Sequence, residues 1–224
     1  MILTRLQWQV GSLHHHIYAY TANKGTTDCI TEMLSTISDR KAVVTFMDLE
    51  KAFEMASGPV ILASLAEKGV QGRLLRWTQD FLSDRQARVI LQGTLSDLAT
   101  FENGTPQGSI LSPFLFNILV ENLVSLPLGA CTKILGYADD LALITTGPWH
   151  AQSVQTAITA VGNSYVELGL KINTTKTKAV HFDSQTPRPP PKAPGYQHKL
   201  GQQLPLSRHL ARLPADLQEI RGRY

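Results

Sequence analysis

Apolar and polar positions along the chain follow two periods, one typical of strands and one typical of helices. The run "AVVTFMDL" at 42–49 is apolar and β-branched over the length of a strand, and it ends near an acid. In "KILGYADDLALITT" at 133–146, two short apolar runs flank an acidic pair, which predicts a β-hairpin with polar residues at its tip. Further short strands are predicted at 87–93, at the start of 100–108 and at 177–182.

Helices are predicted where apolar residues recur every three or four positions. The opening "MILTRLQWQVG" has the pattern of an amphipathic helix, and a second helix is predicted up to Ile37 with Thr27 or Asp28 as its N-cap. In the segment 72–85 the same spacing places Trp77 toward the core. The other predicted helices span 58–69, 112–126 and 150–169.

The order of these elements is typical of an α+β fold of the split βαβ type, in which helices cover one face of an antiparallel sheet. With 224 residues and 43% hydrophobic content, the chain can bury a substantial core. The stretch "DSQTPRPPPKAPG" at 183–195 is rich in proline, which excludes a helix or a central strand and predicts a linker or exposed loop.

Composition narrows the function classes only a little. The net charge of +3 is compatible with a polyanionic partner but is far from that of a tail that binds nucleic acid by charge alone. Cys29 and Cys131 have no partner at disulfide or zinc-site spacing, so an intracellular, reducing setting is expected. The most apolar stretch, 110–128, contains too many polar residues and prolines for a membrane span, and the N-terminus lacks the pattern of a secretory signal.

The candidate chemistry lies in three acids. Asp48 follows the first predicted strand, and Asp139 and Asp140 lie at the tip of the predicted hairpin. If neighbouring strands end side by side, these three carboxylates converge, and their repulsion is usually relieved by a divalent cation with oxygen ligands, such as Mg²⁺. The alternative is an ordinary exposed turn, where aspartate is also favoured.

A loop between these acids supports the functional interpretation. In "NGTPQGS", Pro106 fixes its own backbone and Gly108 permits close approach, so Gln107 is presented on a stiff turn before a helix. Such a turn suits contact with a base, sugar or phosphate. As an isolated tetrapeptide, "TPQG" would more often be a simple turn.

Taken together and in this order, the blocks resemble reverse transcriptases, in particular those of non-LTR (LINE-type) retrotransposons. "FMDLEKAFE" resembles the first catalytic motif of that family, "NGTPQGSILSPFLFNIL" the second, "LGYADDLALI" the third and "LGLKINTTKTKAV" the fourth. The resemblance covers the chain from about Lys24 to His181. "QHKLGQQLPLSRHL" resembles the next block, a primer-contacting hairpin, although Lys199 stands where the family has an aromatic residue.

The resemblance implies RNA-directed DNA synthesis from deoxynucleoside triphosphates, with an RNA template, a DNA primer and two Mg²⁺ ions, or Mn²⁺ in their place. Asp48 would bind both ions together with the Leu49 carbonyl, Asp139 would be the second bridging carboxylate, and Asp140 the weaker third. Lys176 would act as a general acid toward the leaving pyrophosphate, with Lys178 as the alternative.

The resemblance also assigns the substrate pockets. Phe53 would pack under the incoming sugar and exclude a 2′-hydroxyl. Gln107 and Gly108 would line the nucleotide pocket, and the predicted primer and template contacts are Tyr137, Ala138, Leu200 and Gly201.

In domain terms, residues 1–202 are expected to form a reverse transcriptase domain, mainly the palm with part of the fingers, and 203–224 the start of a thumb or an irregular tail. The remaining fingers would precede residue 1, and most of the thumb would follow Tyr224. A truncated, catalytically incompetent remnant that binds nucleic acid weakly is therefore the main alternative. A nucleotide cyclase is a less favoured alternative, since cyclases share paired acids on a hairpin but would not be expected to have the "TPQG" loop.

One further cluster is the run of three histidines at 14–16. Solvated side chains at a helix end are favoured there over a metal site or a tag fragment, because no carboxylate or cysteine stands at ligand spacing.

Overall fold

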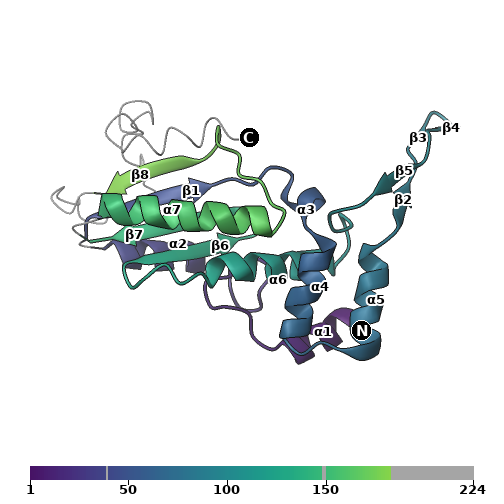
Figure 1. Ribbon diagram of the computed structural model, residues 1–224, viewed down its shortest axis with the longest axis horizontal. Helices are drawn as coiled ribbons and strands as arrows, with labels where there is room; N and C mark the ends of the chain where they lie inside the picture. The colour runs from purple at the N-terminus through teal and green to yellow at the C-terminus, as the bar shows by residue number, and fades with distance from the viewer. Residues whose placement is uncertain (39, 148–149, 183–224) are drawn as a thin grey trace, which may run out of the picture.

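A four-stranded antiparallel sheet, in the order β6-β7-β1-β8, forms the centre of the fold (Figure 1). The computed structural model describes residues 1–38, 40–147 and 150–182. The antiparallel pairing and the mixed α+β composition confirm the predicted fold class. The four strands are β1 (Ala42–Met47), β6 (Thr132–Tyr137), β7 (Asp140–Thr146) and β8 (Lys178–Phe182).

Seven helices lie within the described residues, and they agree with the predicted ones except for a short additional helix directly after β1. The second helix begins earlier than predicted: its N-cap is Gly25, whose N–H donates to Oδ2 of Asp28 at 2.7 Å, so Asp28 caps from inside the helix. The helices are α1 (Ile2–Val10), α2 (Thr26–Ile37), α3 (Ala52–Met55), α4 (Gly58–Glu67), α5 (Gly72–Leu82), α6 (Ser112–Val124) and α7 (His150–Glu167).

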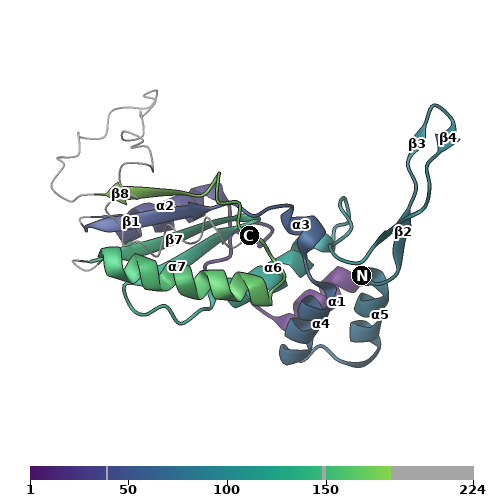
Figure 2. The ribbon, with the colours of Figure 1, turned by 45° about the horizontal axis from the view of Figure 1, so that its top comes forward.

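Helices cover both faces of the sheet, whereas the sequence predicted one covered face (Figures 1 and 2). Successive residues of a strand point to opposite faces. On β7, Leu141 and Leu143 belong to the core cluster shared with α6 and α7, while Ala142 and Ile144 belong to a second cluster that includes Ile37 of α2. In the sequence, β7 shows this burial as successive apolar residues that do not alternate with polar ones, which is typical of a strand buried on both faces.

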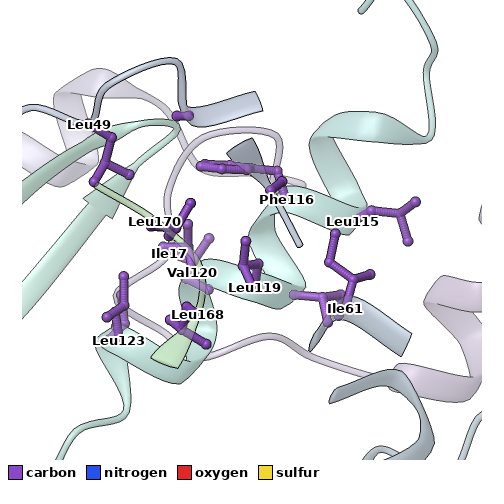
Figure 3. Close-up of a cluster of buried hydrophobic side chains, with 14 of the residues drawn as sticks. Ile17, Leu49, Ile61, Leu115, Phe116, Leu119, Val120, Leu123, Leu168 and Leu170 are labelled. Atoms are coloured by element: carbon purple, nitrogen blue, oxygen red, sulfur yellow. The ribbon is translucent and has the colours of Figure 1, made fainter. Parts of the chain in front are cut away.

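The larger core is built around α6, which is buried on nearly all sides (Figure 3). Leu115 and Leu119 are fully buried, and Phe116 stacks on Phe53 with ring centroids 4.5 Å apart. Burial of a large apolar side chain contributes about 1.5–3 kcal/mol. Through Phe53 this core extends to the loop after β1, and Leu49 of that loop is itself only 5% exposed.

A long β-arm projects from the body beyond α5 (Figure 2). The predicted strand at 87–93 is divided into two shorter ones, because the arm pairs in two separate sections. Trp77 is 41% exposed and stacks on Phe81, so its predicted core position is wrong: Thr78 and Leu82 are the buried residues of α5. The arm consists of β2 (Arg85–Ala87), β3 (Ile90–Leu91), β4 (Thr94–Leu95) and β5 (Ala99–Phe101).

Several sequence predictions lie outside the described residues. These are the linker or loop at 183–195, the thumb or tail at 203–224, and the primer contacts Leu200 and Gly201. In the part of the chain that is described, no helix combines the length and apolar character needed to cross a membrane.

Candidate active site

The three acids predicted to act together lie at one end of the central sheet. β1 and β7 run antiparallel with Met47 opposite Leu141, so Asp48, directly after Met47, and Asp140, directly before Leu141, lie at the same end of neighbouring strands. Asp139 is in the turn that joins β6 to β7. The strand register thus brings the first predicted motif alongside the third.

The turn between β6 and β7 holds a strained residue. Tyr137 pairs with Asp140, which leaves Ala138 and Asp139 as the two residues of the loop. Ala138 has φ of 55°, a backbone region that costs an alanine on the order of 1 kcal/mol or more. A positive φ at the first loop position is typical of tight hairpin turns, and here it presents Asp139 exposed at the tip.

The acids influence one another electrostatically. Burial, followed by the charges of Asp139 and Asp48, raises the pKa of Asp140, while Lys176 acts in the opposite direction. Nζ of Lys176 lies 3.5 Å from Oδ2 of Asp48. This oxygen is buried yet accepts no hydrogen bond, so Lys176 satisfies it by charge at a distance and not by a directed contact.

The donor set fits a hard divalent cation. A buried carboxylate oxygen without a hydrogen-bond donor, next to two more carboxylates, is the ligand chemistry that Mg²⁺ prefers. Within residues 1–38, 40–147 and 150–182, however, the only three or more potential ligand side chains with atoms all within 4.8 Å of one another are His14, His15 and His16. The three aspartates therefore share a strand end without closing into a compact ligand set.

A turn after α7 holds Lys176 near Asp48. The N–H of Asn173 donates to the Asp48 carbonyl at 2.8 Å, and the N–H of Glu50 donates to the Lys171 carbonyl at 2.8 Å. Oδ1 of Asn173 accepts from the N–H of Lys176 at 3.3 Å and from the hydroxyl of Thr175 at 2.7 Å. Asn173 thus connects the first predicted motif to the fourth, a role that the sequence interpretation missed.

The two candidate lysines differ in position. Lys176 follows the Asn173 turn and reaches Asp48, whereas Lys178 begins β8, where it pairs with Phe46. The contact with Asp48 supports Lys176 as the lysine of the site.

The loop that carries Gln107 is fixed against α3. The N–H of Gly104 donates to the Ala56 carbonyl and that of Thr105 to the Phe53 carbonyl, both at 2.8 Å. At its exposed end, Nε2 of Gln107 donates to Oε1 of Glu54 at 2.7 Å. This hydrogen bond orients Gln107, and a positioning role for Glu54 was not predicted from the sequence.

Tyr137 connects the β6–β7 turn, which carries Asp139, to helix α2. Its hydroxyl accepts a hydrogen bond from Oγ1 of Thr26, the first residue of α2, at 2.8 Å. Leu49 and Phe53 are anchored in the larger core, so the side chains next to Asp48 are held in place from beneath.

The profile of the family "Reverse transcriptase (RNA-dependent DNA polymerase)" matches residues 1–205. The chain belongs to the reverse transcriptase family. Reverse transcriptases are generally dependent on divalent metal ions, in keeping with the oxygen ligands at the strand ends.

Relatives of this reverse transcriptase domain come from type-1 retrotransposable elements and similar mobile elements, which confirms the predicted LINE-type origin. It is 30% identical over 111 residues to the Pol polyprotein of element R2 from Popillia japonica, covering 45% of this chain and 18% of that protein. It is 36% identical over 103 residues to a putative 115 kDa protein of element R1DM from Drosophila melanogaster, covering 46% and 10%. The RNA-directed DNA polymerase of mobile element jockey from Drosophila funebris is 28% identical over 145 residues, covering 61% and 16%.

Solved structures agree in fold. Apo telomerase of Candida tropicalis, truncated from its C-terminal domain, matches with a TM-score of 0.65 at 16% identity, over 83% of this chain and 41% of that one. A second structure of apo telomerase from the same organism gives a TM-score of 0.65 at 14% identity, over 82% of this chain and 37% of that one. The predicted polymerase palm is thereby confirmed as a fold. The reverse transcriptase domain described here corresponds to a minor part of each relative.

Asp140 gives this domain a measurable pH signature. Because its pKa is raised in the folded state, ionising it costs stability, and the cost is present above the raised pKa and absent below the ordinary value of 3.8. Without divalent metal, Asp140→Asn is therefore expected to stabilise the domain slightly at pH 7, by less than about 1 kcal/mol in the free energy of unfolding for this exposed group, and to have no effect near pH 3. Thermal melts at both pH values test this.

Magnesium provides the internal control for that variant. Added Mg²⁺ is expected to stabilise the wild-type domain more than Asp140→Asn, because the variant lacks one anionic oxygen ligand. A variant that is less stable than the wild type at pH 7 without metal would contradict the electrostatic interpretation.

Proposed function

We propose that this domain is the polymerase part of an RNA-directed DNA polymerase that adds deoxynucleotides to the 3′-hydroxyl of a DNA primer on an RNA template. The observation that carries the proposal is the shared strand end of Asp48, Asp139 and Asp140, with Lys176 at 3.5 Å from Asp48. These residues belong to the first, third and fourth motifs, in the order expected of the family. Such substrates imply an intracellular site of action.

In the proposed site, Asp48 and Asp139 would hold two Mg²⁺ ions, with the Leu49 carbonyl as a further ligand and Asp140 as the weaker third acid. The bound ions would stabilise the attacking and leaving oxygens of phosphoryl transfer, and Mn²⁺ would serve in their place. Lys176, whose Nζ lies 3.5 Å from Oδ2 of Asp48, would be placed to donate a proton to the leaving pyrophosphate. The contact of Lys176 with Oδ2 of Asp48 is long, and this oxygen is the proposed metal ligand.

The nucleotide pocket is proposed to lie between the loop of Gln107 and the ring of Phe53. Phe53 is held by its stack on Phe116, which fixes the ring that would exclude a 2′-hydroxyl. Gln107 and Gly108 would contact the base and template, with the amide of Gln107 oriented by Glu54. Tyr137 and Ala138 would lie at the primer end, followed farther along the chain by Leu200 and Gly201.

We also propose the domain boundaries from the sequence: a reverse transcriptase domain over 1–202 that includes the loop 183–195, and a thumb segment or tail from 203 onward. The chain spans only 10 to 20% of the length of the relatives it matches, so flanking segments belong in any activity test.

The decisive experiment is primer extension on an RNA template, using the 224-residue chain alone and the same chain joined to the flanking segments of its R2 or jockey relatives. We expect the joined protein to extend the primer with Mg²⁺ and to prefer deoxynucleotides over ribonucleotides. Absence of extension under conditions in which the intact relative works would refute the proposal. That result would favour the alternative of a catalytically incompetent remnant.

Glu54 is expected to act as a positioning residue in that assay. Glu54→Ala removes the acceptor that holds Gln107, and we expect a loss of about 3- to 10-fold in kcat/KM, mainly through KM, because an exposed hydrogen bond to a charged group contributes about 1 kcal/mol. Glu54→Gln keeps an oxygen acceptor and is expected to restore most of the loss.

The matched control is Glu67→Ala, which removes an exposed glutamate from the end of α4 and is expected to leave both kinetic constants unchanged. Equal losses in the Ala and Gln variants of Glu54 would show that its charge matters and not its hydrogen bond to Gln107.

A further inference from the structure

His14, His15 and His16 form a tight cluster apart from the aspartates. Their ring centroids lie 4.0 to 5.1 Å apart, and each residue offers a ligand atom within 4.8 Å of the other two. His16 is only 9% exposed, so the solvated side chain expected from the sequence is wrong for this residue. A turn at His15 and His16 brings the three consecutive rings together.

We propose that His14, His15 and His16 bind one transition-metal ion of the Zn²⁺ class. Three imidazole nitrogens are a donor set that Zn²⁺ accepts in tetrahedral geometry, with the fourth position left to water. The distances between the ligand nitrogens of the three histidines need to shorten by about 1–2 Å before each nitrogen can lie roughly 2.0–2.1 Å from one ion. Rotation of the imidazole rings can supply this change. The aspartate site prefers hard cations with oxygen ligands, so the two sites select different ions.

The protonation state of the cluster favours metal binding. Burial, with the neighbouring histidines, lowers the pKa of His16 to about 4, and burial together with His15 lowers that of His14. These two rings are therefore neutral at pH 7, and neutral imidazole is the form that binds metal. Lys24 and Lys133 oppose a cation here, while Glu121 and Glu32 favour positive charge, so the surrounding charges largely offset one another.

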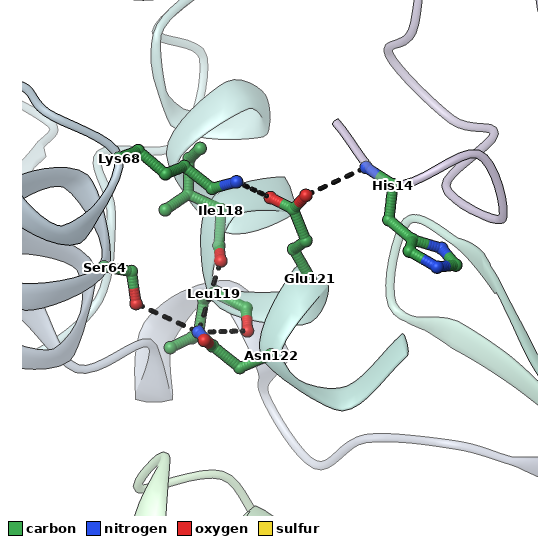
Figure 4. Close-up of polar contacts among 7 residues, drawn as sticks. All are labelled: His14, Ser64, Lys68, Ile118, Leu119, Glu121 and Asn122. Carbon is green, nitrogen blue, oxygen red and sulfur yellow. Dashed lines mark hydrogen bonds and ion pairs between the residues drawn. The ribbon is translucent and has the colours of Figure 1, made fainter. Parts of the chain in front are cut away.

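The backbone of the cluster is already held in place. The N–H of His14 donates to Oε1 of Glu121 at 2.9 Å, and Oε2 of Glu121 pairs with Lys68 at 2.8 Å (Figure 4). The carbonyl of His16 accepts from the N–H of Gly136 on β6 at 2.9 Å. A site whose backbone is fixed before binding loses less conformational entropy when the ion arrives.

One weak hydrogen bond would be exchanged. The N–H of His16 donates to Nδ1 of His14 at 3.2 Å, a long contact. Binding through Nε2 of His14 moves the ring proton to Nδ1 and breaks this contact, whereas binding through Nδ1 replaces it directly. In both cases the neutral ring keeps its one proton, so binding releases none. The only interaction lost is one weak hydrogen bond, which a metal–nitrogen bond outweighs.

A bound ion would fasten the N-terminal segment to the sheet. Ile17, next to His16, forms a parallel bridge with Gly136, and the N–H of Tyr18 donates to the Gly136 carbonyl at 2.9 Å. Gly136 is followed by Tyr137 and the turn with Asp139. The ion would therefore stabilise the folded domain to the extent that it binds the ordered cluster more tightly than the same three histidines in the unfolded chain.

The test uses Zn²⁺ itself, titrated calorimetrically into the whole 224-residue chain with excess Mg²⁺ present to occupy the aspartates. We expect saturable binding that is weakened at least tenfold in His15→Gln, whose exposed ring makes the substitution compatible with folding, and further in the double variant His14→Gln/His15→Gln. His181→Gln, an exposed histidine on β8, is the matched control and is expected to bind like the wild type.

Thermal melts provide a second readout that does not depend on heat of binding. Zn²⁺ is expected to raise Tm of the wild type and of His181→Gln but not of the double variant, while the metal-free Tm of His15→Gln matches that of the wild type. The proposal is overturned if the wild type shows no saturable Zn²⁺ binding, or if the histidine variants bind and are stabilised as strongly as the wild type.

Discussion

Asp139→Asn is expected to lower the proposed primer extension, measured in the protein joined to flanking segments, on the order of 10³-fold. The substitution keeps the shape of the side chain but removes the negative charge proposed to bridge both metal ions, and metal-ion stabilisation of phosphoryl transfer amounts to several kcal/mol. Asp139 is exposed at the tip of the β6–β7 turn, so its loss should leave Tm nearly unchanged. The measurement is primer extension beside a thermal melt of the same preparation.

Two further variants make that result specific. Asp48→Asn is expected to be as severe as Asp139→Asn, whereas Asp140→Asn should be milder, because Asp140 is proposed as the weaker ligand. Asp80→Asn removes an exposed aspartate from α5, far from the strand ends, and should keep full activity. Retention of more than about a tenth of the activity by Asp139→Asn would exclude a bridging role, because a tenfold change corresponds to only about 1.4 kcal/mol.

The order and type of the main elements could be predicted because hydrophobic periodicity is a local property. β1, the β6–β7 hairpin, α6 and α7 all lie where the pattern placed them. Burial on the second face could not be predicted, because it depends on where α2 packs after the fifteen-residue connection 11–25. Trp77 is another example: its spacing fits a core face, but α5 lies at the border of the body and buries Thr78 and Leu82 instead.

Of the candidate site, the aspartates could be found because carboxylates at the ends of apolar runs are conspicuous in a sequence. Their supports could not be found in this way. Asn173 acts through its backbone N–H on Asp48, and Glu54 through one hydrogen bond to Gln107, 53 positions away in the sequence. Such contacts depend on strand register and on the path of a loop, and neither residue type is unusual where it stands.

Gly104→Ala is expected to destabilise the domain by about 2 to 5 kcal/mol and to lower Tm by roughly 10 °C. Gly104 has φ of +90°, and a Cβ there would lie 2.6 Å from the Glu54 carbonyl oxygen and 2.8 Å from the Phe53 carbonyl oxygen. These are backbone atoms fixed by the hydrogen bonds from Gly104 to Ala56 and from Thr105 to Phe53, so they cannot move aside without breaking the loop from α3.

Gly129→Ala is the control that separates two costs of Gly104→Ala: the contact of the new Cβ with the Phe53–Glu54 backbone and the strain of a positive φ. Gly129 has φ of +87°, close to that of Gly104, but an added Cβ would meet no atom within 4 Å. Its substitution should therefore cost only the left-handed strain of about 1–2 kcal/mol. The difference between the two variants in chemical denaturation measures the close approach of the Gln107 loop to α3. Equal losses would mean that the loop does not pack against the Phe53–Glu54 backbone, and the orientation of Gln107 by Glu54 would then have no structural basis.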